Sequence, residues 1–182
     1  MLYQILSLLL DVAAGLIGGA CLLRLYMQRL RVPFGNPVGR MVFALSDWLV
    51  VPLRRLLPAL RGWDSASLVG AYLVQLVQFT LLWLAVGAAG PGGLLPLAAL
   101  FGLLRLVLTV ATVLVIVGAI MSWVRADSSL VNVIERLCAP LLRPLRRVIP
   151  LVGGIDLSPL ALLLLLQVAG IVLAGVQASV MR

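Results

Sequence analysis

Histidine and lysine are both absent from this 182-residue sequence, which contains only six acidic residues and two cysteines. Without histidine, a common general base and metal ligand of enzymes is missing, and the few carboxylates are too scattered for a metal cluster or an acid–base pair. No phosphate-binding loop or haem-attachment motif occurs, so we expect neither enzymatic activity nor a cofactor. Cys21 and Cys138 form no CxxC pair and indicate no disulfide framework.

Charged residues are scarce, at 11% of the chain, whereas 63% of the residues are hydrophobic and the mean hydropathy is +1.20. So little polar surface cannot cover a water-soluble globule of this length, and the composition therefore predicts a membrane protein. All fourteen basic residues are arginine, and the net charge is +8. Arginines that flank apolar runs are typical of membrane topology rather than of phosphate recognition, so we expect no nucleic-acid partner.

Four apolar stretches are long enough to cross a bilayer as helices, over residues 2–24, 66–89, 94–124 and 158–180. Unpaired backbone groups cannot face lipid, so these stretches must be helical and the fold class is all-α. No basic residue precedes Arg24, which argues against a cleaved signal peptide and for a retained first helix.

A repeat divides the chain into two similar units, residues 1–89 and 94–182. Pro-Leu-Arg-Arg at residues 52–55 returns at 144–147, and Asp64 returns as Asp156, each 92 positions later. Each unit reads as a span, a basic amphipathic segment (residues 38–58 and 129–150) and a second span. The sequence therefore predicts four transmembrane helices arranged as two parallel repeats.

The arginines also predict an orientation. Six lie between Arg29 and Arg61 and five between Arg125 and Arg147, whereas the connection over residues 87–96 has none. Because positive loops stay inside, both amphipathic segments should be cytoplasmic and both termini periplasmic, in a bacterial inner membrane.

The basic segments are expected to lie at the headgroups, as amphipathic helices do. Their arginines predict contact with anionic lipid or with partner proteins: Arg54, Arg55, Arg143, Arg146 and Arg147. The alternative is that these arginines only fix the orientation. Pro52 and Pro144 each suit the first turn of a further short helix, which Pro58 and Pro150 would end.

Asp64, Asp156 and Ser158 stand where the chain re-enters the membrane. Such residues cap a helix by accepting its first backbone N–H groups, and Pro159 after Ser158 suits the first turn. The alternative is that the two aspartates pair with the arginine doublets. Replacing both by asparagine separates the alternatives, because asparagine caps almost as well but carries no charge.

Two ionised residues lie within predicted spans, Asp11 and Arg105. Counted from the outer ends of their helices, both lie about 14 to 16 Å deep, so we predict a contact between them. Thr109 and Thr112 continue the Arg105 face. This polar stripe either lines an ion or proton path or forms a buried pair that fixes helix register.

Small residues predict where helices approach closely. Gly15 and Gly19 form a GxxxG pattern, and one face of the last span carries Gln167, Gly170, Ala174 and Gln177, typical of a seam within the bundle or between the protomers of a homo-oligomer. Arg24, at the inner end of the first span, is expected to extend to the headgroups.

Several motifs together resemble the YggT (YlmG) family of small integral membrane proteins, in its duplicated bacterial form. They are Asn36-Pro37, Ser46-Asp47-Trp48-Leu49, the two Pro-Leu-Arg-Arg segments, Ile120-Met121-Ser122-Trp123 and Gly153-Gly154-Ile155-Asp156-Leu157-Ser158-Pro159. The first unit departs in having Arg61-Gly62-Trp63-Asp64 without the double glycine. The resemblance implies the topology above and links to osmotic stress, ion homeostasis and cell division, but no catalytic residue.

The sequence thus favours a non-enzymatic inner-membrane scaffold or assembly factor that presents basic amphipathic segments to lipids and other membrane proteins. The competing hypothesis is a small transporter or channel component in osmotic adaptation, with Asp11, Arg105, Thr109 and Thr112 along its path.

Overall fold

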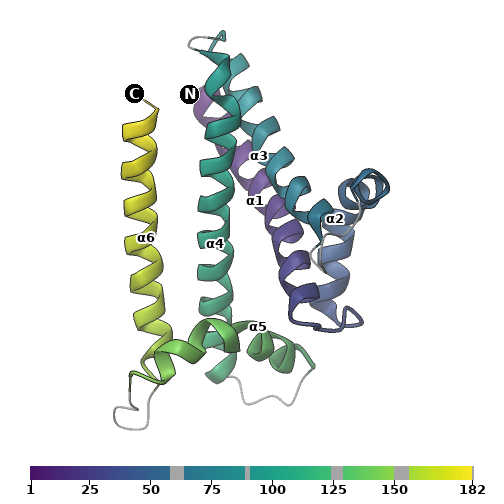
Figure 1. The fold of residues 1–182 in the computed structure, drawn as a ribbon, viewed down its shortest axis with the longest axis vertical. Coiled ribbons are helices and arrows are strands. Elements are labelled where there is room, and N and C mark those ends of the chain that lie inside the picture. The colour runs from purple at the N-terminus through teal and green to yellow at the C-terminus, as the bar shows by residue number, and fades with distance from the viewer. Residues whose placement is uncertain (58–63, 89–90, 124–128, 150–155, 182) are drawn as a thin grey trace.

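The computed structural model describes residues 1–57, 64–88, 91–123, 129–149 and 156–181, and this part of the chain is helical with short connections. The helices are α1 (Leu2–Arg29), α2 (Pro37–Leu56), α3 (Ser65–Ala85), the 3₁₀ turn η1 (Gly92–Leu94), α4 (Leu95–Trp123), α5 (Ser129–Arg146) and α6 (Ser158–Val180). Figure 1 shows α1, α3, α4 and α6 running along the long axis, with α5 lying across one end.

Four of these helical segments are long and apolar enough to cross a membrane: Leu2–Arg29, Ser65–Ala85, Gly92–Ser122 and Ser158–Val180. Both chain termini point toward the end of the bundle where η1 joins α3 to α4, and α5 lies at the opposite end (Figure 1). The described chain is therefore an all-helical bundle of membrane-spanning dimensions.

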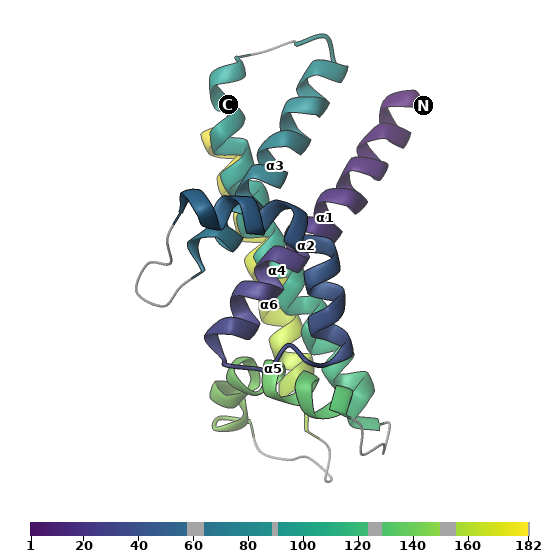
Figure 2. The ribbon, with the colours of Figure 1, turned by 90° about the vertical axis from the view of Figure 1, so that its right-hand side faces the viewer.

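The core lies around the second half of α1. One cluster, which includes Met27, Val42 and Leu137, joins α1 and α2 to α4 and α5, and a second, which includes Cys21, Val50 and Ala71, joins α1 and α2 to α3 and α4. By contrast, the first half of α1 is largely exposed; it stays beside α3 but diverges from α4 (Figure 2). In the second half of the chain, α6 packs on α4 and α5 and buries only Ser158.

Local chemistry fixes the start of α2. The Oδ1 atom of Asn36 accepts a hydrogen bond of 2.9 Å from the backbone N–H of Gly39, and Pro37 occupies the first helical turn. The helix then continues through Pro52, and its second part lies across the direction of its first (Figure 2). A proline inside a helix removes a backbone hydrogen bond and commonly causes such a bend.

The predicted short helices at Pro52 and Pro144 are wrong. Pro52 lies inside α2, and Pro144 lies inside α5 together with Pro140. The packing of the flanking turns holds the helical path across these prolines, so they do not end it. Pro58 and Pro150, predicted to end the short helices, lie outside the described residues.

Candidate functional site

Arg24 is buried in the bundle, with only 3% of its surface exposed. Its Nη1 atom donates to Asp47 Oδ1 at 2.6 Å and to Ser46 Oγ at 3.0 Å, and its Cζ atom lies 4.8 Å from the centre of the Phe43 ring. The prediction that Arg24 extends to the headgroups is therefore wrong. The reason is that α2 folds back onto α1, so that the Asp47 carboxylate takes the place of a lipid phosphate as the anionic partner of Arg24.

Asp64 extends this network to α3. Its Oδ2 atom lies 2.5 Å from Arg54 Nη2, 3.9 Å from Arg24 Nε and 2.6 Å from Ser67 Oγ, which donates to it. Burial alone would raise the pKa of Asp64, but the hydrogen bonds from Arg54 and Ser67 and the charge of Arg54 hold that pKa below its usual value. Arg24 and Asp64 are buried, whereas the side chains of Asp47 and Arg54 reach the surface; after its buried centre, we call these four residues the buried charge network.

Asp64 therefore pairs with an arginine of the doublet. It occupies the N-cap position of α3, yet its carboxylate makes no capping hydrogen bond. Of the two alternatives that the sequence left open for this residue, the geometry favours the ion pair over the cap.

The second half of the chain has a matching pair. Asp156 Oδ2 lies 2.8 Å from Arg146 Nε, and both residues follow their counterparts by 92 positions. Asp156 Oδ1 also accepts a hydrogen bond of 2.9 Å from the backbone N–H of Ser158, so this aspartate both pairs and caps. Burial alone would raise the pKa of Asp156, but the hydrogen bonds from Ser158 and Arg146 and the charge of Arg146 together hold that pKa below its usual value.

Ser158 itself does not cap α6. Leu157 holds the N-cap position, Ser158 is the first helical residue, and its buried Oγ has no hydrogen-bond partner. The prediction of a Ser158 cap is wrong because Asp156, two residues earlier, already accepts the first free N–H group.

Arginines gather on α5 around a hollow of about 590 Å³, which is lined by Ala139, Pro140, Arg143, Arg146 and Arg147. Arg143 and Arg147 are exposed, whereas Arg146 is engaged with Asp156. In α2, Arg54 is held by Asp64 and Arg55 is exposed. In each arginine doublet, the first arginine therefore forms an ion pair and the second is exposed.

Asp11 does not contact Arg105, so the predicted pair is wrong. Asp11 Oδ1 instead accepts a hydrogen bond of 2.5 Å from Gln78 Nε2 of α3. The register of the helices explains the difference: a Cβ added at Gly18 would lie 2.8 Å from the Leu106 side chain, so Arg105 lies beside the middle of α1 rather than beside Asp11. Gly15 has nothing within 4 Å of such a Cβ, so the close approach is at Gly18 and not at the first glycine of the GxxxG pattern.

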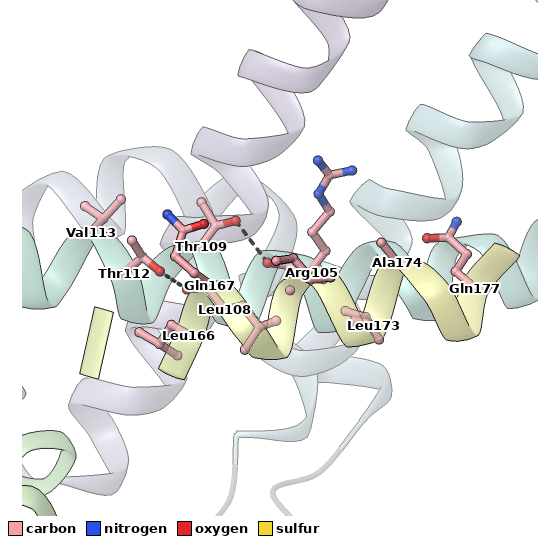
Figure 3. Close-up of a pocket in the computed structure, with 12 residues that line it drawn as sticks. Arg105, Leu108, Thr109, Thr112, Val113, Leu166, Gln167, Leu173, Ala174 and Gln177 are labelled. Carbon is pink, nitrogen blue, oxygen red and sulfur yellow. Dashed lines mark hydrogen bonds between the residues drawn. The ribbon is translucent and has the colours of Figure 1, made fainter. Parts of the chain in front are cut away.

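Arg105 lies in a groove between α4 and α6. The groove has a volume of about 410 Å³, and its polar lining residues are Arg105, Thr109, Thr112, Gln167 and Gln177. Both threonine hydroxyls donate to backbone carbonyls of their own helix (Figure 3). Thr109 donates to the Arg105 carbonyl at 3.0 Å, and Thr112 donates to the Leu108 carbonyl at 2.8 Å. The Gln177 amide donates to Met181 Sδ at 3.5 Å, so Arg105 and the Gln167 amide are the side chains of the groove whose donors have no partner among the described residues.

The residues predicted as a helix seam, Gln167, Gly170, Ala174 and Gln177, line the α6 side of this groove. A Cβ added at Gly170 would meet nothing within 4 Å, so α4 and α6 do not pack tightly here. The four residues share one face of α6, and nothing in the sequence shows that this face borders open space.

Sequence analysis missed the partners of the intramembrane charges. In the sequence, Asp47 stands out only as part of the Ser46-Asp47-Trp48-Leu49 motif, and Gln78 lies unremarked within an apolar span. Other anchors were also unforeseen: Tyr26 Oη donates to the Leu137 carbonyl at 2.8 Å, and Cys138 Sγ donates to the Leu114 carbonyl at 3.1 Å. Among the residues that the structure describes, no three metal-ligating side chains come together.

These features define a helical membrane protein with four candidate spans, charges inside the bundle and arginines at one end. A family model described as CCB3/YggT matches residues 2–85 and 97–177, so the chain belongs to the CCB3/YggT family. The chain is 38% identical to the uncharacterized protein YggT of Escherichia coli K12 over 175 residues. This aligned stretch covers 94% of this chain and 90% of that protein.

Other relatives agree with this membership. An uncharacterized protein of Pseudomonas aeruginosa is 34% identical over 150 residues (80% of this chain and 76% of that protein), and one of Vibrio alginolyticus is 31% identical over 159 residues (85% of each). No solved structure matches the chain.

Proposed function

We propose that this protein is a non-enzymatic scaffold or assembly factor of the bacterial inner membrane. It is built from two parallel repeats, each with an amphipathic helix, α2 or α5, at the cytoplasmic leaflet. Two observations support the repeat: the family model matches the chain in two stretches, and the pairs Arg54–Asp64 and Arg146–Asp156 recur 92 residues apart.

The amphipathic role is most evident for α5. Its buried residues Val133, Ile134 and Leu137 face the bundle, whereas Glu135 and Arg136 are exposed. A helix with these two faces, lying across the end of the spans, suits the boundary between headgroups and hydrocarbon (Figure 1).

The hollow on α5 is the observation that most directly supports this proposal. Arg143, Arg146 and Arg147 line it together, and the planar guanidinium group binds phosphate oxygens in pairs. Anionic lipid attracts each nearby arginine by about 1 kcal/mol, so this cluster holds α5 against an anionic leaflet. By the distribution of arginines, that leaflet is the cytoplasmic one, which leaves both termini periplasmic.

Other membrane proteins can contact this protein within the bilayer through α6, because the apolar outer face of α6 is exposed along its length. Large exposed apolar surfaces are where other membrane helices pack. A scaffold of this kind binds lipids through α5 and other membrane proteins through both α5 and its spans.

Arg143→Gln combined with Arg147→Gln tests the lipid contact while leaving the Arg146–Asp156 pair intact. We expect anionic lipid retained after mild detergent extraction, measured by native mass spectrometry, to fall several-fold, together with the recovery of partners in pull-downs from membranes. Arg40→Gln, an exposed arginine of α2, is the matched control. Unchanged lipid and partner recovery in the double variant would reject the proposed role of α5.

The groove between α4 and α6 favours a second candidate, a small transporter or channel component in osmotic stress and ion homeostasis. Its polar lining within a candidate span, including the ionised Arg105, is the kind of surface that lines ion paths. Purified protein in liposomes should then conduct ions, and Arg105→Leu should abolish the flux, whereas Leu104→Ala beside it should not. Wild-type protein without flux would exclude this candidate.

A further inference from the structure

Arg105 carries a charge that the described chain leaves unpaired. It lies within the candidate span Gly92–Ser122, is exposed, and makes no ion pair or guanidinium hydrogen bond with any described residue. No carboxylate lines its groove, where hydroxyl and amide groups surround it. Because an unpaired charge in hydrocarbon is costly, a group outside this copy of the chain is required to neutralise it.

Asp11 presents the complementary charge. Of the described carboxylates it alone lies within a candidate span, since Asp47, Asp64, Glu135 and Asp156 lie outside them. Asp11 is exposed, and its one hydrogen bond is the neutral one from Gln78 to Oδ1, which leaves Oδ2 free.

The two charges do not meet within one chain. The Gly18–Leu106 contact sets the register of α1 and α4, and the first half of α1, which carries Asp11, diverges from α4 (Figure 2). A helix rises about 1.5 Å per residue, so counting from this contact places Arg105 at most about 9 Å farther than Asp11 from the end of the bundle that carries the chain termini. The long, flexible arginine stem can direct its guanidinium along the membrane normal over much of this offset.

We infer that two copies of this protein associate in the same orientation, with the first half of α1 of one copy against the α4–α6 groove of the other. Asp11 then pairs with Arg105 across the interface. The first half of α1 is free to make this contact, because Leu8 and Leu9 are 63% and 62% exposed. The groove can receive a helix, because the surface at Gly170 is open. This inference is independent of whether the protein scaffolds or transports.

Reversing one charge at a time tests the pair directly. Two differently tagged full-length copies are co-expressed and one tag is captured from detergent. Arg105→Asp in both copies, or Asp11→Arg in both, should lower recovery of the second tag by about thirtyfold, as loss of a desolvated ion pair does. An Asp11→Arg copy mixed with an Arg105→Asp copy should restore it, because each then supplies the charge that the other lacks.

Cross-linking in native membranes provides a readout that does not depend on charge reversal. In a background with Cys21 and Cys138 replaced by alanine, an Asp11→Cys copy should cross-link to an Arg105→Cys copy through a thiol-reactive reagent with a spacer of about 10 Å, because cysteines offset in depth by about 9 Å cannot form a direct disulfide. An Ile116→Cys copy is the control, since Ile116 follows Arg105 by eleven residues on the same exposed face, about 16 Å deeper.

Three results would overturn the inference. The first is unchanged association of either folded charge-reversal variant, and the second is no recovery when the two variants are mixed. The third is cross-linking at Ile116 equal to that at Arg105. Copies that remain single in bilayer nanodiscs would equally refute it and would assign the Arg105 charge to a bound anion or another protein.

Discussion

The Nη2 atom of Arg54 lies 2.5 Å from the Oδ2 atom of Asp64, where α2 ends and α3 begins. Ninety-two residues later, Arg146 and Asp156 form the corresponding ion pair between α5 and α6, with 2.8 Å between Nε and Oδ2. The surroundings differ, because the Asp64 side chain is 4% exposed and lies beside buried Arg24, whereas the Asp156 side chain is 29% exposed. The two pairs should therefore contribute unequally to stability.

Asp64→Asn and Asp156→Asn measure this inequality. Removing the Asp64 charge leaves Arg24 with Asp47 alone inside the bundle, which should lower the free energy of unfolding by about 3 kcal/mol. The more exposed Asp156 pair should cost less than about 1 kcal/mol. Thermal unfolding in detergent, followed by tryptophan fluorescence, compares the two variants. Equal losses would contradict the buried charge network.

Acid should weaken the bundle through Asp64. Its pKa in the folded protein is held below the usual carboxyl value, since the Arg54 and Ser67 hydrogen bonds outweigh burial. The resulting stabilisation is complete above the unfolded pKa of about 3.9 and is lost as pH falls toward the folded pKa. Unfolding measured between neutral pH and about pH 2 should show this loss in the wild type. In Asp64→Asn it should be much smaller, and an identical pH profile in the variant would refute the assignment.

Arg24→Leu removes the centre of the network. Asp47 and Asp64 would then lose a buried cation, and we expect about 3–5 kcal/mol of destabilisation. Arg40→Leu is the control, because Arg40 lies exposed on α2 and should change stability by less than about 0.5 kcal/mol. A chemical-denaturant titration of both variants gives the comparison, and a tolerated Arg24→Leu would show that the network contributes little.

Gly39→Ala should strain the start of α2. An added Cβ would clash with the carbonyl oxygen of Phe34 and lie 2.7 Å from the Cα atom of Phe34, so the backbone must shift at a cost of about 1–3 kcal/mol. Gly35 has nothing within 4 Å, and Gly35→Ala should be tolerated within about 0.5 kcal/mol. The difference in unfolding temperature between these two variants checks the close approach. A harmless Gly39→Ala would contradict it.

The spans could be predicted from the sequence because each is a continuous apolar run, and a run of that length needs no knowledge of its neighbours. The Arg54–Asp64 and Arg146–Asp156 pairs were foreseeable as an alternative to capping. Each pair is only ten residues apart across a re-entry point, so local geometry brings its members together.

The partners of Arg24, Asp11 and Arg105 could not be predicted, because they depend on helix register and rotation. Counting residues from the helix ends placed Asp11 and Arg105 at one depth, but the Gly18–Leu106 contact shifts α1 against α4 and assigns Asp11 to Gln78. Likewise, the turn between α1 and α2 lays Asp47 against Arg24, and nothing in the apolar pattern specifies how the two helices face each other after that turn.

The attachment of α6 has a consequence for biosynthesis. This helix packs mainly on α4 and α5, while the buried charge network lies among α1, α2 and the start of α3. Helices made early can therefore complete their ionic contacts in the bilayer before the ribosome has released the last span, since domains form in order of synthesis. The final helix then joins a preassembled unit and is the one that can detach without disturbing the charges made before it.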